Sequence, residues 1–249
     1  MSNSTLVNYT KLSPNHSGKR NHKIDTISIH CMAGNLSVES CGNLFSQPIR
    51  KASSNYGIGS DGRIALYVDE VNRSWCTSSS SNDNRAVTIE IANIGGADQG
   101  WPVSSKAYSA LIDLLVDICK RNDIKKLLWK ADKTLIGQVD KQNMTVHRWF
   151  ANKSCPGDWL YNKHTEIAQK VNERLLCNNP EKEEENMPVY THLQDVPQSY
   201  RPAIKKLMEK KALVGYKDPD PRRLDDNVIN VTEDFCRVMT VLNNMGKLD

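Results

Sequence analysis

Apolar and polar residues change their spacing several times along the first part of the chain, and each change predicts a new element. Residues 24–30 (IDTISIH) alternate isoleucines with smaller polar residues, which predicts a strand that ends in a histidine. Residues 53–68 predict a β-hairpin, because Asp61-Gly62 is a tight-turn signal between two strand-like runs. Residues 85–93 (RAVTIEIAN) predict another strand, rich in β-branched side chains.

Helical spacing follows in the same part of the chain. Ser37 is the expected N-cap of a short helix, and Ser104 is the expected N-cap of a longer one. The apolar stripe of the longer helix consists of Ala107, Leu111, Leu114, Leu115 and Ile118. Short strand-like runs at 127–129 and 144–149 precede a last helix from about Trp159 to Leu176. This alternation predicts an α/β fold with a mixed central β-sheet flanked by helices.

The composition changes after residue 177, which indicates a second domain. Residues 178–188 are charged and contain prolines, so we expect an acidic linker between a domain at 1–177 and a domain at 189–249. The second domain has two helical patterns, SYRPAIKKLMEKKALVG and VTEDFCRVMTVLNNMG, the latter with Thr232 as N-cap. We therefore expect a small, mainly helical C-terminal domain that is marginally stable alone.

Composition and charge exclude several classes of protein. The net charge of +4 is mildly basic, and no run of five or six basic residues is present, so we expect no nucleic-acid partner. No stretch approaches the roughly 18 apolar residues of a membrane span. The N-terminus has no apolar signal-peptide core, so we expect synthesis in the cytoplasm. Seven scattered cysteines indicate free thiols or metal ligands rather than a disulfide framework.

The segment HRWFANKSCPGDW brings three chemically active side chains together, His147, Lys153 and Cys155. A catalytic zinc site uses three protein ligands and leaves one position open. His147 and Cys155 can supply two ligands, and His30, at the end of a core strand, is the best third candidate. Cys31 is a poorer candidate, because neighbours on a strand face opposite sides of the sheet. The residues alone equally fit a core histidine and cysteines that act as small buried hydrophobes.

A metal-free enzyme is a second interpretation of the same residues. Cys31 precedes His147 in the chain, as the nucleophile precedes the base in papain-type and CHAP-type hydrolases. This dyad leaves His30, Lys153 and Cys155 unexplained.

Four segments occur in the order found in a known enzyme family: IDTISIHCMAG, SSNYGIGSDGRI, AVTIEIANIGG and TVHRWFANKSCPGDWL. Over roughly residues 20–176 the chain resembles the zinc-dependent N-acetylmuramoyl-L-alanine amidases of the T7 lysozyme and peptidoglycan recognition protein fold. The resemblance is greatest to the amidase endolysins of phages that infect clostridia and related Gram-positive bacteria.

The resemblance implies a site as well as an activity. It implies that His30, His147 and Cys155 bind Zn²⁺ and that Lys153 stabilises the reacting oxyanion. Tyr56 and Glu90 both match residues that members use in catalysis, so the general base is not settled.

The implied reaction is hydrolysis of the amide bond between N-acetylmuramic acid and L-alanine in peptidoglycan. An endolysin of this kind waits in the host cytoplasm until holin-type release or cell lysis. A peptidoglycan recognition module without catalysis is the alternative from another class. Such modules lose the metal-binding cysteine, whereas Cys155 is present.

The C-terminal domain has a looser resemblance. Residues 193–215 are similar to the first half of an S-layer homology module, which implies binding to cell-wall polysaccharide. The alternative is a helical pair that docks on the catalytic domain or forms a homodimer through Phe235, Val238 and Leu242.

Overall fold

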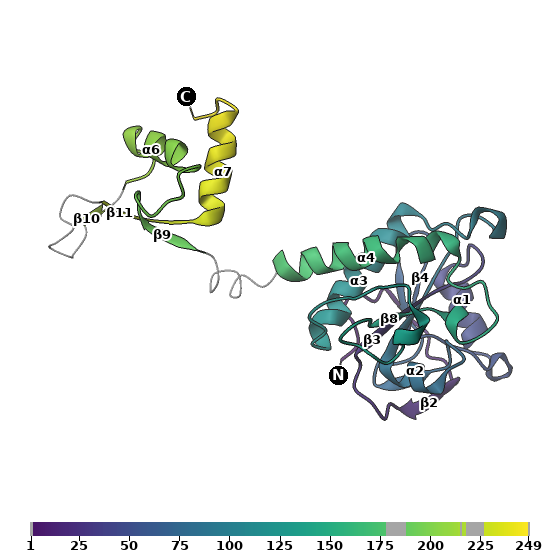
Figure 1. Ribbon diagram of the computed structural model, residues 1–249. Helices are drawn as coiled ribbons and strands as arrows, with labels where there is room; N and C mark the ends of the chain where they lie inside the picture. The colour runs from purple at the N-terminus through teal and green to yellow at the C-terminus, as the bar shows by residue number, and fades with distance from the viewer. Residues whose placement is uncertain (1, 178–187, 215, 218–226, 249) are drawn as a thin grey trace. The chain divides into compact units, whose positions relative to one another are not determined.

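The computed structural model describes residues 2–177, 188–214, 216–217 and 227–248. They belong to two compact units, Met1–Asn178 and Asn179–Asp249, which are considered separately (Figure 1). Residues 178–187 of the predicted linker lie outside the described residues. Within the described part of the chain, no helix combines the length and apolar character needed to cross a membrane.

A six-stranded mixed β-sheet forms the centre of the first unit, as the sequence predicts. Its strands are β1 (Tyr9–Thr10), β3 (Thr26–Cys31), β4 (Tyr56–Ile58), β5 (Ile64–Leu66), β7 (Ala86–Ile91) and β8 (Met144–Thr145). Their order across the sheet is β1-β5-β4-β7-β3-β8. The predicted hairpin is the antiparallel pair β4–β5, and the other neighbours run parallel. A separate antiparallel pair joins β2 (His16–Lys19) and β6 (Asn72–Ser74).

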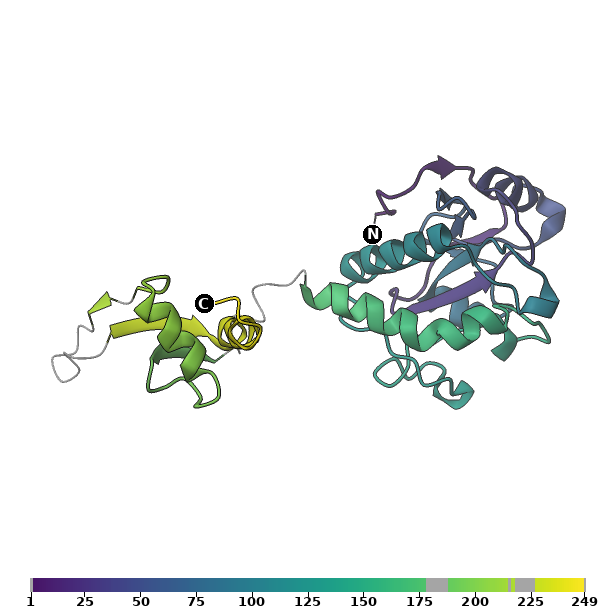
Figure 2. The ribbon, with the colours of Figure 1, turned by 90° about the horizontal axis from the view of Figure 1, so that it is seen from above.

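Helices cover both faces of the sheet. The long helices α3 (Ser105–Arg121) and α4 (Asp158–Cys177) lie side by side across one face (Figure 2). The other face carries α1 (Val38–Phe45), and α2 (Ser80–Arg85) leads directly into β7. Short 3-10 segments complete the unit: η1 (Pro48–Arg50), η2 (Ala97–Gln99), η3 (Lys133–Leu135) and η4 (His147–Trp149). The predicted caps are confirmed, since Ser37 and Ser104 each accept a backbone hydrogen bond from the first turn.

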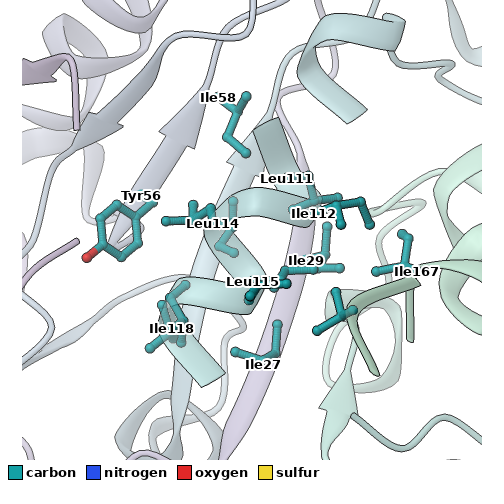
Figure 3. Close-up of a cluster of buried hydrophobic side chains, with 14 of the residues drawn as sticks. Ile27, Ile29, Tyr56, Ile58, Leu111, Ile112, Leu114, Leu115, Ile118 and Ile167 are labelled. Atoms are coloured by element: carbon teal, nitrogen blue, oxygen red, sulfur yellow. The ribbon is translucent and has the colours of Figure 1, made fainter. Parts of the chain in front are cut away.

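Side chains alternate between the two faces of the sheet along each strand, so one set enters the helix-covered core and the other set faces the opposite side. Ile27 and Ile29 of β3 pack with isoleucines of β4 and β7 and with the apolar stripe of α3 (Figure 3). The residues that alternate with them, Ser28 and His30, therefore face the opposite side of the sheet. Full burial of each large apolar side chain contributes about 1.5–3 kcal/mol, so this alternation is fixed by the core.

Two predicted strands are shorter or absent. The run at 127–129 forms no strand; instead the side-chain oxygen of Asn143 accepts a hydrogen bond from the Leu128 backbone, 2.7 Å away. The strand predicted at 144–149 ends at Thr145, because His147 begins η4. His147 therefore lies just beyond a strand end rather than within a strand.

A buried ion pair ties the end of α3 to the sheet. The Glu70 carboxylate is fully buried and accepts two hydrogen bonds from Arg121, at 2.9 and 2.6 Å. It also accepts a 2.6 Å hydrogen bond from the Tyr56 hydroxyl, which in turn accepts one from the Ser4 backbone. These contacts join the N-terminal segment, β4 and α3 at one buried point.

The second unit has two helices and a small antiparallel sheet. The helices α6 (Arg201–Glu209) and α7 (Glu233–Asn244) confirm the predicted pair, with Thr232 as the N-cap of α7. The strands β9 (Val189–His192), β10 (Tyr216–Lys217) and β11 (Asn227–Thr232) form a sheet in the order β10-β11-β9. This sheet was not expected from the pattern of apolar residues.

The core of the second unit contains residues from both its helices and its sheet. Its buried side chains are Val196, Ile204, Leu207, Ile229, Val231 and Cys236. Phe235, which was predicted to lie in a dimer contact, packs against this core, whereas Val238 is 54% exposed. Self-association of this unit therefore stays a prediction.

We predict that Arg121→Ala lowers the free energy of unfolding of the first unit by about 3–5 kcal/mol, because it leaves the buried Glu70 carboxylate without its cation. The control Arg63→Ala removes solvent-exposed ion pairs with Glu39 and Asp61 and should have a much smaller effect, because water screens exposed charges. Denaturant titration followed by tryptophan fluorescence measures both, since all five tryptophans lie in the first unit. Equal effects of the two variants would contradict the prediction.

Candidate metal site

The register of the sheet and the end of one strand bring three polar residues together. His30 of β3 lies directly beside Glu90 of β7. On its other side β3 pairs with β8, with Ser28 opposite Thr145. The strand β8 ends there, and His147 follows as the first residue of η4, where its ring centroid lies 5.2 Å from that of His30. His30 and Glu90 belong to the sheet face that α3 and α4 do not cover, and His147 meets them there.

The three predicted metal ligands converge at this point. The donor atoms of His30, His147 and Cys155 all lie within 4.8 Å of one another. The Cys155 sulfur is 3.3 Å from Nδ1 of His30. Tetrahedral zinc, with bonds of about 2.3 Å to sulfur and about 2.1 Å to nitrogen, places two such ligands roughly 3.6 Å apart. The donor set and its spacing therefore fit a zinc ion.

Ser28 determines which ring nitrogen of His30 is available to bind a metal ion. The Ser28 hydroxyl donates its proton to the Thr145 carbonyl, 3.2 Å away. It therefore accepts a hydrogen bond from Nε2 of His30, at 3.1 Å. This tautomer leaves the Nδ1 lone pair free, on the side of the ring that faces Cys155. An outer contact of this kind orients a metal-binding histidine and holds the required tautomer.

The loop that carries Cys155 is closed by Arg148. The Arg148 backbone donates to the Cys155 carbonyl at 3.1 Å, and its guanidinium donates to the Ser154 carbonyl and to Asp158. Gly157 follows with φ of +83°, and a Cβ there would lie 2.7 Å from the Gly100 carbonyl oxygen. The Pro-Gly of the motif thus lets the loop pass close to a neighbouring turn before α4 begins.

Burial and neighbouring charges favour the protonation states that a metal site needs. Burial, together with the rings of His147 and His164, holds the pKa of His30 well below its usual range. Burial and the Lys153 cation lower the pKa of His147. Both imidazoles are therefore neutral near pH 7. A hydrogen bond with Cys31 and burial raise the pKa of Cys155, so this thiol loses its proton only when a cation replaces it.

Glu90 and Lys153 lie beside the candidate ligands. Burial is the main reason that the pKa of Glu90 lies well above its usual range. Its Oε2 atom is buried and has no hydrogen-bond partner among the described residues. Lys153 is exposed and, with Glu90, His147 and Cys155, lines a cavity of about 650 Å³. The cavity connects the candidate metal site to solvent.

Cations predominate among the charged residues that line the cavity. They are Arg50, Lys51, Arg73 and Lys153, whereas the acidic lining residues are Asp83 and Glu90. Asp83 is almost fully buried and accepts hydrogen bonds from Thr77. The accessible charge of the cavity is therefore positive, which favours an anionic ligand.

The structure does not bring Tyr56 to this site. Tyr56 pairs with Ile89 across β4 and β7, lies in the helix-covered core beside Leu114, and is fully buried (Figure 3). Its hydroxyl is bound to Glu70 on that side of the sheet. The prediction of a catalytic Tyr56 is therefore withdrawn, because the strand alternation directs this side chain away from His30 and Glu90.

Several residues at the site were missed or misjudged from the sequence. No sequence motif marks Ser28 or Arg148 as part of the site, because the role of each depends on a hydrogen bond to a backbone carbonyl that only the folded chain brings near. Cys31 was set aside as facing the opposite side of the sheet, yet it lines the same cavity as Cys155. It does not belong to either group of three clustered donors among the described residues. Cys31 is thus a neighbour of a ligand rather than a ligand.

We predict that Ser28→Ala weakens zinc binding by roughly 10- to 100-fold, because His30 loses the acceptor that holds its tautomer. Ser74→Ala is a matched control, since Ser74 is equally buried but its hydroxyl contacts Thr88. Competition with a chromophoric chelator measures both affinities. Unchanged affinity in Ser28→Ala would show that the ring is held by other contacts.

Comparisons with known proteins identify relatives of this chain. Among solved structures, the endolysin N-acetylmuramoyl-L-alanine amidase LysCS of Clostridium intestinale is 16% identical, with 69% of this chain and 99% of that chain covered and a TM-score of 0.49. A mutant endolysin from Bacillus subtilis is 18% identical, with 66% and 99% covered and a TM-score of 0.48. The Drosophila peptidoglycan recognition protein SA is 18% identical, with 63% and 90% covered and a TM-score of 0.45.

These structural similarities are too low to support an argument about the chemistry of this chain. No curated protein sequence matches the chain significantly. The family model described as N-acetylmuramoyl-L-alanine amidase matches residues 20–158, which is more than half of the chain and includes His30, Glu90, His147 and Cys155. The chain therefore belongs to the N-acetylmuramoyl-L-alanine amidase family.

Proposed function

We propose that this protein is a zinc-dependent endolysin that hydrolyses the amide bond between N-acetylmuramic acid and L-alanine in Gram-positive peptidoglycan. The observation that carries the proposal is the convergence of the donor atoms of His30, His147 and Cys155 within 4.8 Å, next to an open cavity. Three protein ligands with access to solvent are typical of a catalytic zinc site, whereas structural sites have four. Zinc held by these residues would polarise the scissile carbonyl and acidify the attacking water.

Glu90 is the residue that we assign to proton transfer. It lies in register with His30 and faces the same side of the sheet. Its unpartnered Oε2 atom is free to accept a proton from the attacking water and then to donate it to the leaving amine of L-alanine. Burial raises the pKa of Glu90, which makes this carboxylate a stronger base than a solvated one when it is ionised.

Lys153 is the residue that we assign to the oxyanion. Its ammonium group is exposed at the cavity and close enough to His147 to lower the pKa of that ring. A cation in this position stabilises the negative charge that develops on the carbonyl oxygen. Loss of one such contact commonly lowers kcat by about 100- to 1000-fold.

The alternative thiol mechanism has less support. Cys155, not Cys31, is the cysteine whose sulfur lies within 4.8 Å of donor atoms of both His30 and His147. Cys31 belongs to neither group of clustered donor atoms among the described residues, so its environment does not resemble a nucleophile held beside a base.

We predict that Cys155→Ser loses its tightly bound zinc and its wall-clearing activity, because it removes one of three ligands. Cys31→Ser keeps both, and Glu90→Gln keeps zinc while activity falls. Zinc content by elemental analysis and turbidity of purified walls, with and without a chelator, measure these outcomes. Metal-free activity abolished by Cys31→Ser would establish the thiol mechanism, and zinc binding without lysis of any wall would favour a recognition module.

We also propose that residues 189–249 bind cell-wall polysaccharide and hold the enzyme on its substrate. Support comes from the resemblance of residues 193–215 to part of an S-layer homology module and from a helix pair with its own core. The proposed site of action is the wall, reached from the host cytoplasm after holin-type release or lysis.

We predict that the full-length chain carrying Cys155→Ser, which cannot digest the wall, co-sediments with purified Gram-positive walls. The same variant ending at residue 178 should bind more weakly, because the proposed polysaccharide contact is missing. Gel analysis of the pellet and supernatant measures the bound fraction. Equal binding of the two proteins to walls of several chemotypes would exclude a targeting role for the second unit.

A further inference from the structure

A second set of metal-donor side chains lines the same cavity. The donor atoms of His30, Cys76 and Glu90 lie within 4.8 Å of one another. This group and the zinc triad are the two clusters of at least three such donors among the described residues. They share His30, whereas Cys76 is not part of the proposed zinc site. Both Cys76 and Glu90 line the cavity next to His147 and Cys155.

The fold fixes the Cys76 thiol beside the Glu90 carboxylate. Cys76 follows β6, and its backbone N–H donates to the carboxylate of Asp83 in α2, 3.1 Å away. The thiol is directed at Oε1 of Glu90, at 4.0 Å. Asp83 itself is only 2% exposed and also binds Thr77, so the turn that carries Cys76 is well anchored.

Glu90 has an unused acceptor at this position. Its Oε2 atom is buried without a hydrogen-bond partner among the described residues, which is unusual for a native protein. A cation is a partner that would satisfy both this oxygen and the neighbouring sulfur.

Imidazole, thiolate and carboxylate are all zinc ligands, and a thiolate also favours softer ions such as cadmium. When an ion binds, the Cys76 thiol releases its proton to solvent. Ser28 holds Nε2 of His30, so only Nδ1 is free, and it serves one ion at a time. A second ion therefore depends chiefly on Cys76 and Glu90 and binds more weakly than the first.

We propose that Cys76 and Glu90, next to the shared His30, form a second metal position that binds excess zinc or cadmium and thereby inhibits the enzyme. The inhibitory part of this proposal rests on the proposed function, in which Glu90 transfers the proton. An ion bound to the Glu90 carboxylate occupies the oxygen atoms that would accept that proton. Zinc would then activate the enzyme at a low free concentration and inhibit it at a high one.

The test uses the full-length wild type, Cys76→Ser and a control, Cys41→Ser. Cys41 is another buried thiol that lines the cavity but belongs to neither donor group. Cadmium binding is followed by equilibrium dialysis and by the sulfur-to-cadmium absorbance. Wall clearing is measured as zinc increases from one equivalent to a large excess.

The wild type and Cys41→Ser are expected to bind two cadmium ions, and Cys76→Ser one. Cys76→Ser should keep its activity at one equivalent of zinc. The zinc concentration that inhibits it should rise by at least about tenfold, because a direct ligand is lost and even loss of an outer contact costs roughly 10- to 100-fold in affinity. One ion in the wild type, or two ions and unchanged inhibition in Cys76→Ser, would overturn the proposal.

Failure of the proposed function gives a different pattern. If no wall is cleared at any zinc level, the stoichiometry still decides the second position. Cys155→Ser should then retain one cadmium ion, and the double variant with Cys76→Ser should retain none. Retention of that ion in the double variant would place it elsewhere and overturn the inference.

Discussion

The parallel register of β3 with β7 and β8 is the constraint on which the rest of the site depends. It places Glu90 and His30 in one row before any side-chain contact forms, and it brings His147, just after the end of β8, next to His30. A slip of one residue would move His30 into the helix-covered core and bring an isoleucine to the cavity. The core isoleucines prevent that slip, so burial on one face of the sheet sets the geometry on the other. Cys155 and Lys153 then join this row from a single closed loop.

Much of this arrangement could be predicted from the sequence. Strand-like alternation located the strand that carries His30, and serine caps located α1 and α3. The same period of two could have placed Tyr56 correctly. Tyr56 and Ile58 are two residues apart on one strand, so they share a face, and Ile58 is a core residue. The family resemblance suggested a catalytic tyrosine, but the local pattern already argued against it.

Other features depend on contacts that no local pattern encodes. The role of Ser28 rests on a carbonyl 117 residues away in the chain, and the Cys31–Cys155 contact appears only when the loop folds onto the end of β3. The C-terminal sheet could not be predicted because one of its strands is locally irregular. In β11, Asn230 has a positive φ and the register shifts between Val228 and Val231, so the expected alternation is interrupted.

The two faces of β3 offer separate routes for engineering. Substitutions on the side of Ile27 and Ile29 alter packing against α3 and α4 and thus resistance to heat. Substitutions around the cavity alter ligand preference, with a layer of backbone between the two sets. Effects at distant sites without shared partners usually add. Libraries for thermal tolerance and for a new wall chemotype can therefore be selected in parallel and combined in one chain.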